Sequence, residues 1–213
     1  VFHRSAHRVR WFWASHVIHH SSQHYNLSTA LRQTWTGFVS MGFIFRLPLF
    51  LIGFPPAMIF FVAGLNLIYQ FWIHTEVIDR MPGWFEAVMN TPSHHRAHHA
   101  TNPRYLDTNY AGVFIVWDKM FGTFEPERAD DRPHYGIVKN LGSFNLLWAA
   151  FHEWIGIAQD VWRAPGLRAK LGYLVMPPGW SHDGSRDTSE TIKAQWRVRL
   201  DGMADGKNTD GVR

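Results

Sequence analysis

The segment from Gly37 to Ile73 decides the fold: it reads GFVSMGFIFRLPLFLIG over residues 37–53, FPP over 54–56 and AMIFFVAGLNLIYQFWI over 57–73. Both arms are apolar on nearly every helix face, which favours a bilayer over a pair of buried core helices in a soluble protein. Each arm is near the lower length limit for crossing a bilayer, and the Gly-Phe-Pro-Pro turn reverses the chain. The segment therefore predicts a transmembrane hairpin over residues 37–73.

Three short histidine clusters flank this hairpin: HRSAH over residues 3–7, HVIHH over 16–20 and HRAHH over 95–99. Helical residues three and four apart share a face, so each cluster would present its imidazoles side by side. Neutral imidazole binds iron, zinc, copper and nickel, and eight are too many for one ion. The pattern predicts a two-metal site formed by His3, His7, His16, His19, His20, His95, His98 and His99.

The hairpin explains how these clusters meet on one side of a membrane. Two clusters precede it and one follows, so two crossings bring the chain back to its starting side. Residues 1–36 carry four arginines and no acidic residue, which places that side in the cytosol by the positive-inside rule. His74 follows the hairpin directly and is a candidate ninth ligand.

Polar residues near the third cluster are candidates for supporting roles. We expect His94 to support a neighbouring ligand rather than to bind metal itself. Asp107, Asn109 and Asp118 are candidates for hydrogen bonds to the N–H groups of the ligands, which would orient the imidazoles. For Asp107 and Asn109, ordinary turn chemistry is an equal alternative. The remaining histidines match no pattern: His24, His134, His152 and His182.

The length of 213 residues suits one domain, which we place at residues 1–175. Residues 143–162 are amphipathic and predict either a helix in the membrane interface or a lid over the site. Residues 176–213 form a polar tail without apolar periodicity from about Ser181, which predicts disorder or loose attachment.

Composition narrows the partners and the ligands. Cysteine is absent, which excludes disulfides and thiolate ligands. The net charge of +4, with eleven tryptophans and sixteen phenylalanines, suits an anionic lipid surface. Nucleic acid is not an expected partner, since the chain has no recognised nucleic-acid motif and no basic stripe interleaved with aromatic residues.

The three clusters, in this order around an apolar hairpin, resemble the fatty acid hydroxylase and sterol desaturase superfamily. Four segments are similar to the alkylglycerol monooxygenase group and its bacterial relatives: HHSSQHYNLSTALRQ from residue 19, LIYQFWIHTEVI from 67, NTPSHHRAHH from 90 and NYAGVFIVWDKMFGTFE from 109. The resemblance implies an all-α integral membrane enzyme in which the eight cluster histidines, with His74, hold two irons. It also implies O2 as the oxidant and a lipid substrate.

In the alkylglycerol monooxygenase group, the electron donor is tetrahydrobiopterin, and hydroxylation of the carbon next to the ether oxygen yields a fatty aldehyde and a glycerol. This chain departs from the group at Arg8 and at Gln23-His24, where acidic residues are usual. If those acids serve the pterin, another donor is required. Members of the superfamily carry membrane helices upstream, whereas this chain begins two residues before His3. We therefore expect an N-terminally truncated fragment.

Three other functions remain open. A fatty acid or sterol hydroxylase or desaturase would take electrons from a redox protein and release no aldehyde. A membrane zinc hydrolase would use metal-bound water and act without O2. A non-catalytic metal-binding membrane protein would consume no O2 with any lipid.

Overall fold

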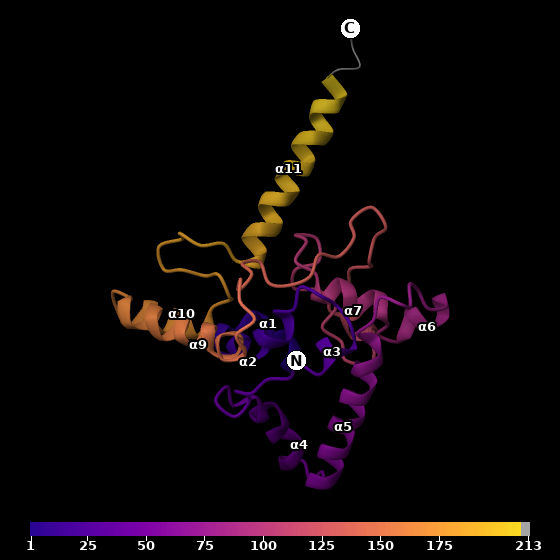
Figure 1. Ribbon diagram of the computed structural model, residues 1–213, viewed down its shortest axis with the longest axis vertical. Coiled ribbons are helices and arrows are strands. Elements are labelled where there is room, and N and C mark those ends of the chain that lie inside the picture. The colour runs from indigo at the N-terminus through magenta and orange to yellow at the C-terminus, as the bar shows by residue number, and fades with distance from the viewer. Residues whose placement is uncertain (210–213) are drawn as a thin grey trace.

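The computed structural model describes the backbone of residues 1–209 and side chains through residue 203; this part of the chain is helical and contains no β-strand. The all-α prediction is therefore confirmed. Figure 1 shows a central body, two arms below it and one long helix above it. The body contains α1 (Phe2–Arg8), α2 (Arg10–His20), α3 (Leu27–Ala30), α6 (Gly83–Val88), α7 (Pro92–His99), α8 (Val116–Met120), α9 (Leu146–Arg163) and α10 (Leu167–Val175).

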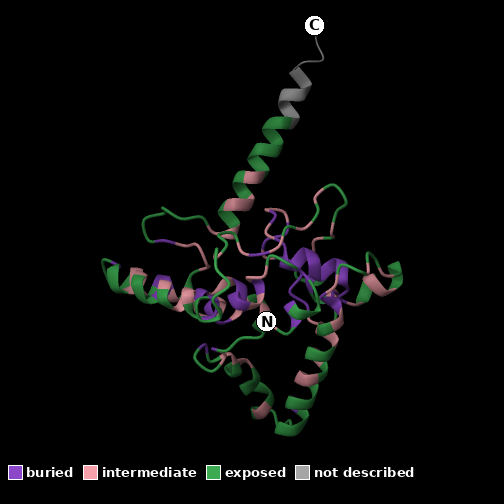
Figure 2. Cartoon of the chain, viewed as in Figure 1, coloured by how far each residue is buried: buried purple, intermediate pink, exposed green. Residues whose placement is uncertain are grey.

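The two arms differ in length. The second arm is α5 (Pro56–Ile73), which starts at a proline and is the one helix within residues 1–209 long and apolar enough to cross a membrane. Only 11% of it is buried, unlike the core helix of a soluble protein. It lies exposed below the body in Figure 2.

The first arm departs from the predicted spanning helix. It consists of the 3₁₀ helix η1 (Gly42–Arg46) followed by α4 (Leu47–Leu51). Met41 adopts a left-handed conformation, and Pro48 lacks an amide hydrogen, so no continuous α-helix forms. At about 1.5–2.0 Å per residue these two helices span less than about 20 Å, against a hydrocarbon core of about 30 Å. Gly53, with φ +94°, lies between the arms.

A break between His7 and His16 separates the first two helices. Val9 is extended and separates α1 from α2. Arg10, which is 5% exposed, donates at 2.6 Å to Glu153 and at 2.6 Å to Asp160, so two ion pairs connect α2 to α9.

The amphipathic segment over residues 143–162 forms helix α9, which the Asn145 side chain caps by accepting from two backbone N–H groups. Its buried face contacts α2 through Ala149 and Ala150, which pack on Ile18. Its other face is exposed and includes Trp162.

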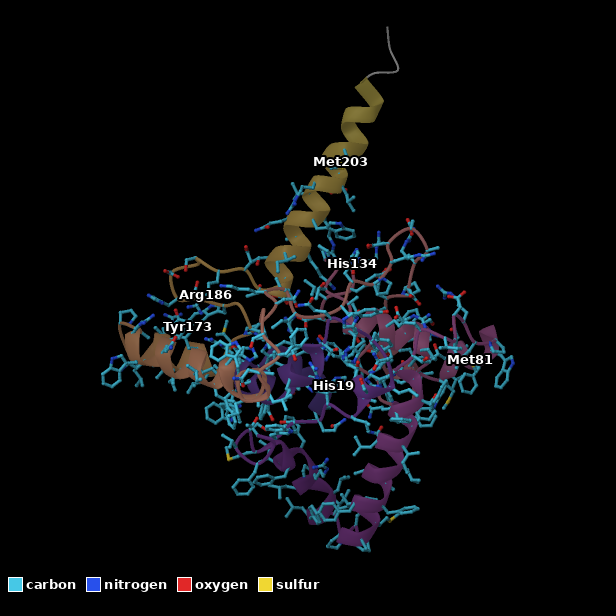
Figure 3. The ribbon with its side chains drawn as sticks, in the orientation of Figure 1. His19, Met81, His134, Tyr173, Arg186 and Met203 are labelled. Atoms are coloured by element: carbon cyan, nitrogen blue, oxygen red, sulfur yellow. The ribbon has the colours of Figure 1, made fainter. Side chains whose placement is uncertain are left out.

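The sequence predicts a disordered or loosely attached tail, and disorder is wrong for α11 (Ser189–Thr209). Residues 210–213 of that tail lie outside the described residues. The Arg8 guanidinium pairs with Glu190 near the start of α11, and Arg104 lies 4.9 Å above the Trp196 ring. Met203 lies far from the body in Figure 3, whereas His19 lies at its centre. These contacts attach the base of a helix whose sequence alone has no apolar stripe.

Candidate metal centre

Nine histidines from α1, α2, α7 and the end of α5 converge in the middle of the body. Their ring nitrogens form two groups, and within each group one nitrogen per residue lies within 4.8 Å of the others. The first group contains His3, His7, His16, His20 and His98; the second contains His19, His74, His95 and His99. The structure therefore brings together all nine histidines that the sequence nominated.

Helix geometry explains the division into two groups. Adjacent helical residues point about 100° apart. His19 and His20 therefore enter different groups, and so do His98 and His99. The His20 and His99 rings stack at a centroid distance of 4.2 Å, which places the two groups side by side. All eight residues of α7 are buried, as its purple ribbon in Figure 2 shows.

Backbone carbonyls fix the orientation of three imidazoles. His3 Nδ1 lies 2.7 Å from the Tyr110 carbonyl oxygen, His98 Nδ1 2.8 Å from that of Thr108, and His74 Nδ1 2.6 Å from that of Gln70. A carbonyl oxygen only accepts, so each Nδ1 carries the hydrogen and donates it. The Nε2 lone pairs then face the other histidines, the arrangement in which metal-binding imidazoles are commonly held.

In the first group the Nε2 atoms approach one another closely. His16 Nε2 lies 3.0 Å from His3 Nε2 and 3.1 Å from His20 Nε2. A neutral imidazole has one hydrogen, and that of His3 is engaged by Tyr110. Neighbouring donors around a metal with bonds of about 2.1 Å lie about 3.0–3.4 Å apart in octahedral or tetrahedral arrangements. The spacing therefore matches the edges of a coordination polyhedron.

The second group repeats this geometry around His74. Its Nε2 lies 3.1 Å from His95 Nε2 and 3.3 Å from His19 Nε2.

The Nε2 atoms of His7, His98 and His99 are buried and have no hydrogen-bond partner among the described residues. Burying such an atom without a partner is costly, so a bound cation is the partner that fits these nitrogens.

Burial also keeps the imidazoles in the neutral form that binds metal. It lowers the pKa of His3 and of His19 to about 3, and that of His74 to about 4. Burial likewise lowers the pKa well below its ordinary value at His16, His20, His95, His98 and His99. The two groups could therefore hold metal ions through uncharged nitrogens.

The predicted supporting residues take different positions. Asp107 Oδ1 lies 3.6 Å from His7 Nδ1. Burial raises the pKa of the Asp107 carboxyl, but the adjacent His7 ring and the Arg8 guanidinium outweigh that effect and hold the pKa below its usual value. Within residues 1–203, Asp118 makes no hydrogen bond to an imidazole; its carboxylate accepts from the backbone N–H groups of Tyr110 at 2.8 Å and Ala111 at 2.7 Å. Asp118 thereby fixes the loop whose carbonyl holds His3.

Asn109 and His94 also lie outside the two groups. The Asn109 amide donates to the backbone oxygens of His94 and Glu125, at 3.0 and 2.7 Å. The His94 ring contacts Phe124 edge-on, with centroids 5.2 Å apart, and burial lowers its pKa to about 4. The hydrogen bonds that orient the imidazoles are accepted instead by backbone carbonyls. The pattern of side chains in the sequence does not predict which carbonyls these are.

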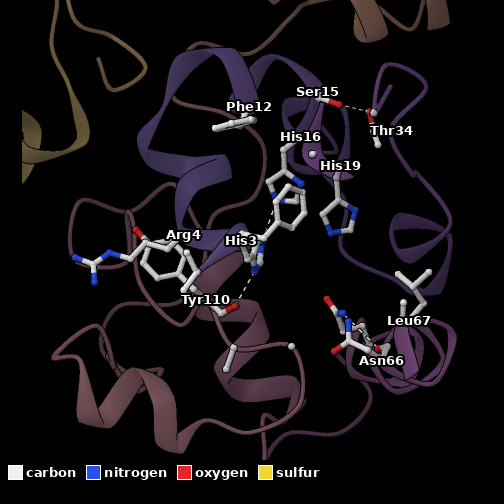
Figure 4. A pocket seen from close by; sticks show the side chains of 18 of the residues that line it. His3, Arg4, Phe12, Ser15, His16, His19, Thr34, Asn66, Leu67 and Tyr110 are labelled. Carbon is white, nitrogen blue, oxygen red and sulfur yellow. Dashed lines mark hydrogen bonds between the residues drawn. The ribbon is translucent and has the colours of Figure 1, made fainter. Parts of the chain in front are cut away.

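A cavity of about 1030 Å³ opens onto both histidine groups. It reaches His3, His16, His19 and His74 and extends along α5 and the start of the first arm. Figure 4 shows His3, His16 and His19 within it, with Phe12 and Asn66 on different sides. A second cavity of about 340 Å³ reaches His7, His20 and His98. An elongated apolar molecule can therefore approach the histidines from the side of the arms.

Comparison with known proteins agrees with this geometry. The sequence model of the family described as "Fatty acid hydroxylase" matches residues 1–123. Alkylglycerol monooxygenases of Danio rerio and Homo sapiens are each 46% identical over 84% of this chain and 39% of their own length. The ornithine lipid hydroxylase OlsE of Rhizobium tropici is 27% identical over 64% of this chain and 41% of that protein. The chain thus spans about two fifths of the length of these relatives. No solved structure matches.

Proposed function

Because this chain belongs to the fatty acid hydroxylase family, we propose that it carries the active site of a di-iron, O2-dependent lipid monooxygenase. The proposed substrate is an alkylglycerol, hydroxylated at the carbon next to its ether oxygen. The hemiacetal so formed collapses to a fatty aldehyde and a glycerol. The 46% identity to two alkylglycerol monooxygenases supports this choice over a fatty acid or sterol hydroxylase.

The observation that carries the proposal is the pair of all-imidazole groups at the end of a cavity along α5. The group of five histidines would hold one iron. The group of four, which includes His74, would hold the other. Bound iron supplies the activation of O2 and the cleavage of a C–H bond.

The chain's own residues do the remaining work. The carbonyl oxygens of Gln70, Thr108 and Tyr110 each hold one imidazole with its Nε2 lone pair directed inward. Both groups consist of histidines alone, so no carboxylate within either group would compensate the positive charge of the metals. The enclosing helices exclude water from the reacting atoms.

We also propose that α5 is inserted in the bilayer, with the histidine groups on the cytosolic side. The exposed apolar arms and the acid-free segment 1–36 support this orientation. The apolar arms would admit the alkyl chain directly from the membrane.

The test is an assay of the purified protein with iron, O2 and a 1-O-alkylglycerol. We expect O2-dependent release of fatty aldehyde. The electron donor is tested in the same assay with tetrahydrobiopterin and with a ferredoxin-type redox protein in separate reactions. Release of a hydroxylated lipid without aldehyde would favour the fatty acid or sterol hydroxylase alternative. Lipid turnover that persists without O2 would contradict both oxygenase functions and favour a hydrolase.

A further inference from the structure

Helix α5 carries two carboxamide side chains, Asn66 and Gln70, within an otherwise apolar arm. Polar side chains in a membrane segment are costly and generally face a cavity or a functional site. Both residues are half-buried and line the large cavity, together with His19 and His74. The Gln70 carbonyl also accepts from His74 Nδ1 at 2.6 Å, which connects this part of α5 to the second histidine group.

The carboxamides also face the loop that positions His3. A Cβ atom added to Gly112 would lie 2.6 Å from Asn66 Oδ1 and 3.2 Å from Gln70 Nε2. The Tyr110 carbonyl, two residues earlier, accepts from His3 Nδ1. The two carboxamides therefore lie between the Gln70 carbonyl, which holds His74, and the loop whose Tyr110 carbonyl holds His3.

The hydrogen-bonding capacity of the pair is largely unused. Gln70 Nε2 donates to the Asn66 backbone oxygen at 3.3 Å, and within residues 1–203 the Asn66 side chain makes no hydrogen bond. Aromatic side chains line other parts of the same cavity, namely Phe2, Phe12, Phe38 and Phe43. In the view of Figure 4, Asn66 and Phe12 lie on different sides of the histidines. The cavity is thus amphipathic, and on α5 the two carboxamides lie among apolar residues.

We propose that Asn66 and Gln70 bind the hydroxyl groups of the glycerol end of the lipid. This assignment rests on the proposed function and names the residues that select its substrate. A hydroxyl both donates and accepts, as a carboxamide does, whereas an ether oxygen only accepts. Residues four apart on a helix have Cβ atoms about 5–6 Å apart, a spacing that suits two oxygens of one glycerol. With the glycerol held there, the carbon next to the ether oxygen is placed beside the histidines.

The test compares the binding of two lipids by the purified protein in detergent. One is a radiolabelled 1-O-alkylglycerol, and the other is the alkyl propyl ether of the same chain length, which lacks both hydroxyls. We expect Asn66→Leu and Gln70→Leu each to weaken alkylglycerol binding by about 3- to 10-fold, as for loss of one neutral hydrogen bond. Binding of the propyl ether should stay at the wild-type level, which also shows that the cavity is intact.

Two further variants separate hydrogen bonding from packing. Leu67→Ala removes an apolar group from the same wall and should weaken both lipids alike. Gly112→Ala displaces the Asn66 amide from the loop side and should weaken the alkylglycerol selectively. An unchanged ratio of the two affinities in Asn66→Leu and Gln70→Leu would overturn the assignment, as would a wild-type protein that binds both lipids equally.

Aldehyde release by the wild-type protein distinguishes this inference from the proposed function. If amide-dependent binding is found without aldehyde release, the proposed reaction fails and the binding site stands. If aldehyde is released while the variants keep the wild-type ratio, the reaction stands and the role of the amides fails.

Discussion

Replacement of Asp118 with alanine should disturb the histidine site without touching any histidine. The Asp118 side chain is 3% exposed and accepts from Tyr110 N, Ala111 N and the Thr123 hydroxyl, at 2.8, 2.7 and 2.6 Å. The alanine leaves two buried backbone N–H groups without partners, at about 1–3 kcal/mol each. The expected loss of unfolding free energy is therefore about 2–6 kcal/mol.

The loss should be measured as a fall in the thermal midpoint in detergent, at about 2–4 °C per kcal/mol for a chain of this size. Because the loop also holds His3 through the Tyr110 carbonyl, iron bound to the five-histidine group should be lost first. Asp118→Asn keeps one acceptor oxygen and should lose about half as much stability.

The matched control is Asp130→Ala, since Asp130 is exposed and pairs with Arg128 at the surface. Water and salt screen a pair at the surface, so this variant should keep the wild-type midpoint and iron content. A wild-type midpoint in Asp118→Ala would refute the role of this carboxylate in the loop.

Three other outcomes are expected. Arg10→Met should lower the unfolding free energy by about 1.5–3 kcal/mol, since Glu153 loses its buried partner whereas Asp160 keeps Arg186; an unchanged thermal midpoint would count against these pairs. Because the chain has no cysteine, single cysteines report topology: Gln23→Cys should react with an impermeant maleimide from the cytosolic side, and Phe54→Cys, between the arms, should not. Chelation of the metal should lower the midpoint, since a ligand at 1,000 times its Kd stabilises the folded state by about 4 kcal/mol; an unchanged midpoint would indicate that the histidines fold without metal.

Local periodicity accounts for the part of the site that sequence patterns predict. The spacing of three and four residues places His16 beside His19 and His20, and the hairpin argument adds His74. All of these lie in the two groups. Helix geometry separates His19 from His20 and His98 from His99, but which histidines of α2 and α7 share a group depends on how these two helices face each other, which the spacing does not specify.

The rest depends on the backbone path and on long-range contacts. The carbonyl oxygens of Gln70, Thr108 and Tyr110 support imidazoles, yet any residue type carries a carbonyl. The first arm has the apolar composition of a spanning helix, but Met41 and Pro48 interrupt it. The tail has no apolar periodicity, so sequence patterns give no indication of α11, whose base is held by Arg8 and Arg104.

The number of irons bound per chain tests the central claim most directly. The purified protein is loaded with ferrous iron and freed of excess metal, and its iron content is measured by elemental mass spectrometry. His19→Ala, His20→Ala and the double variant are treated in the same way. If each histidine group holds one iron, the wild-type protein binds two per chain, and these two adjacent substitutions remove iron from different groups, so the double variant loses both. A wild-type protein that binds one iron or none would contradict the claim. So would a double variant that binds as much iron per chain as either single variant.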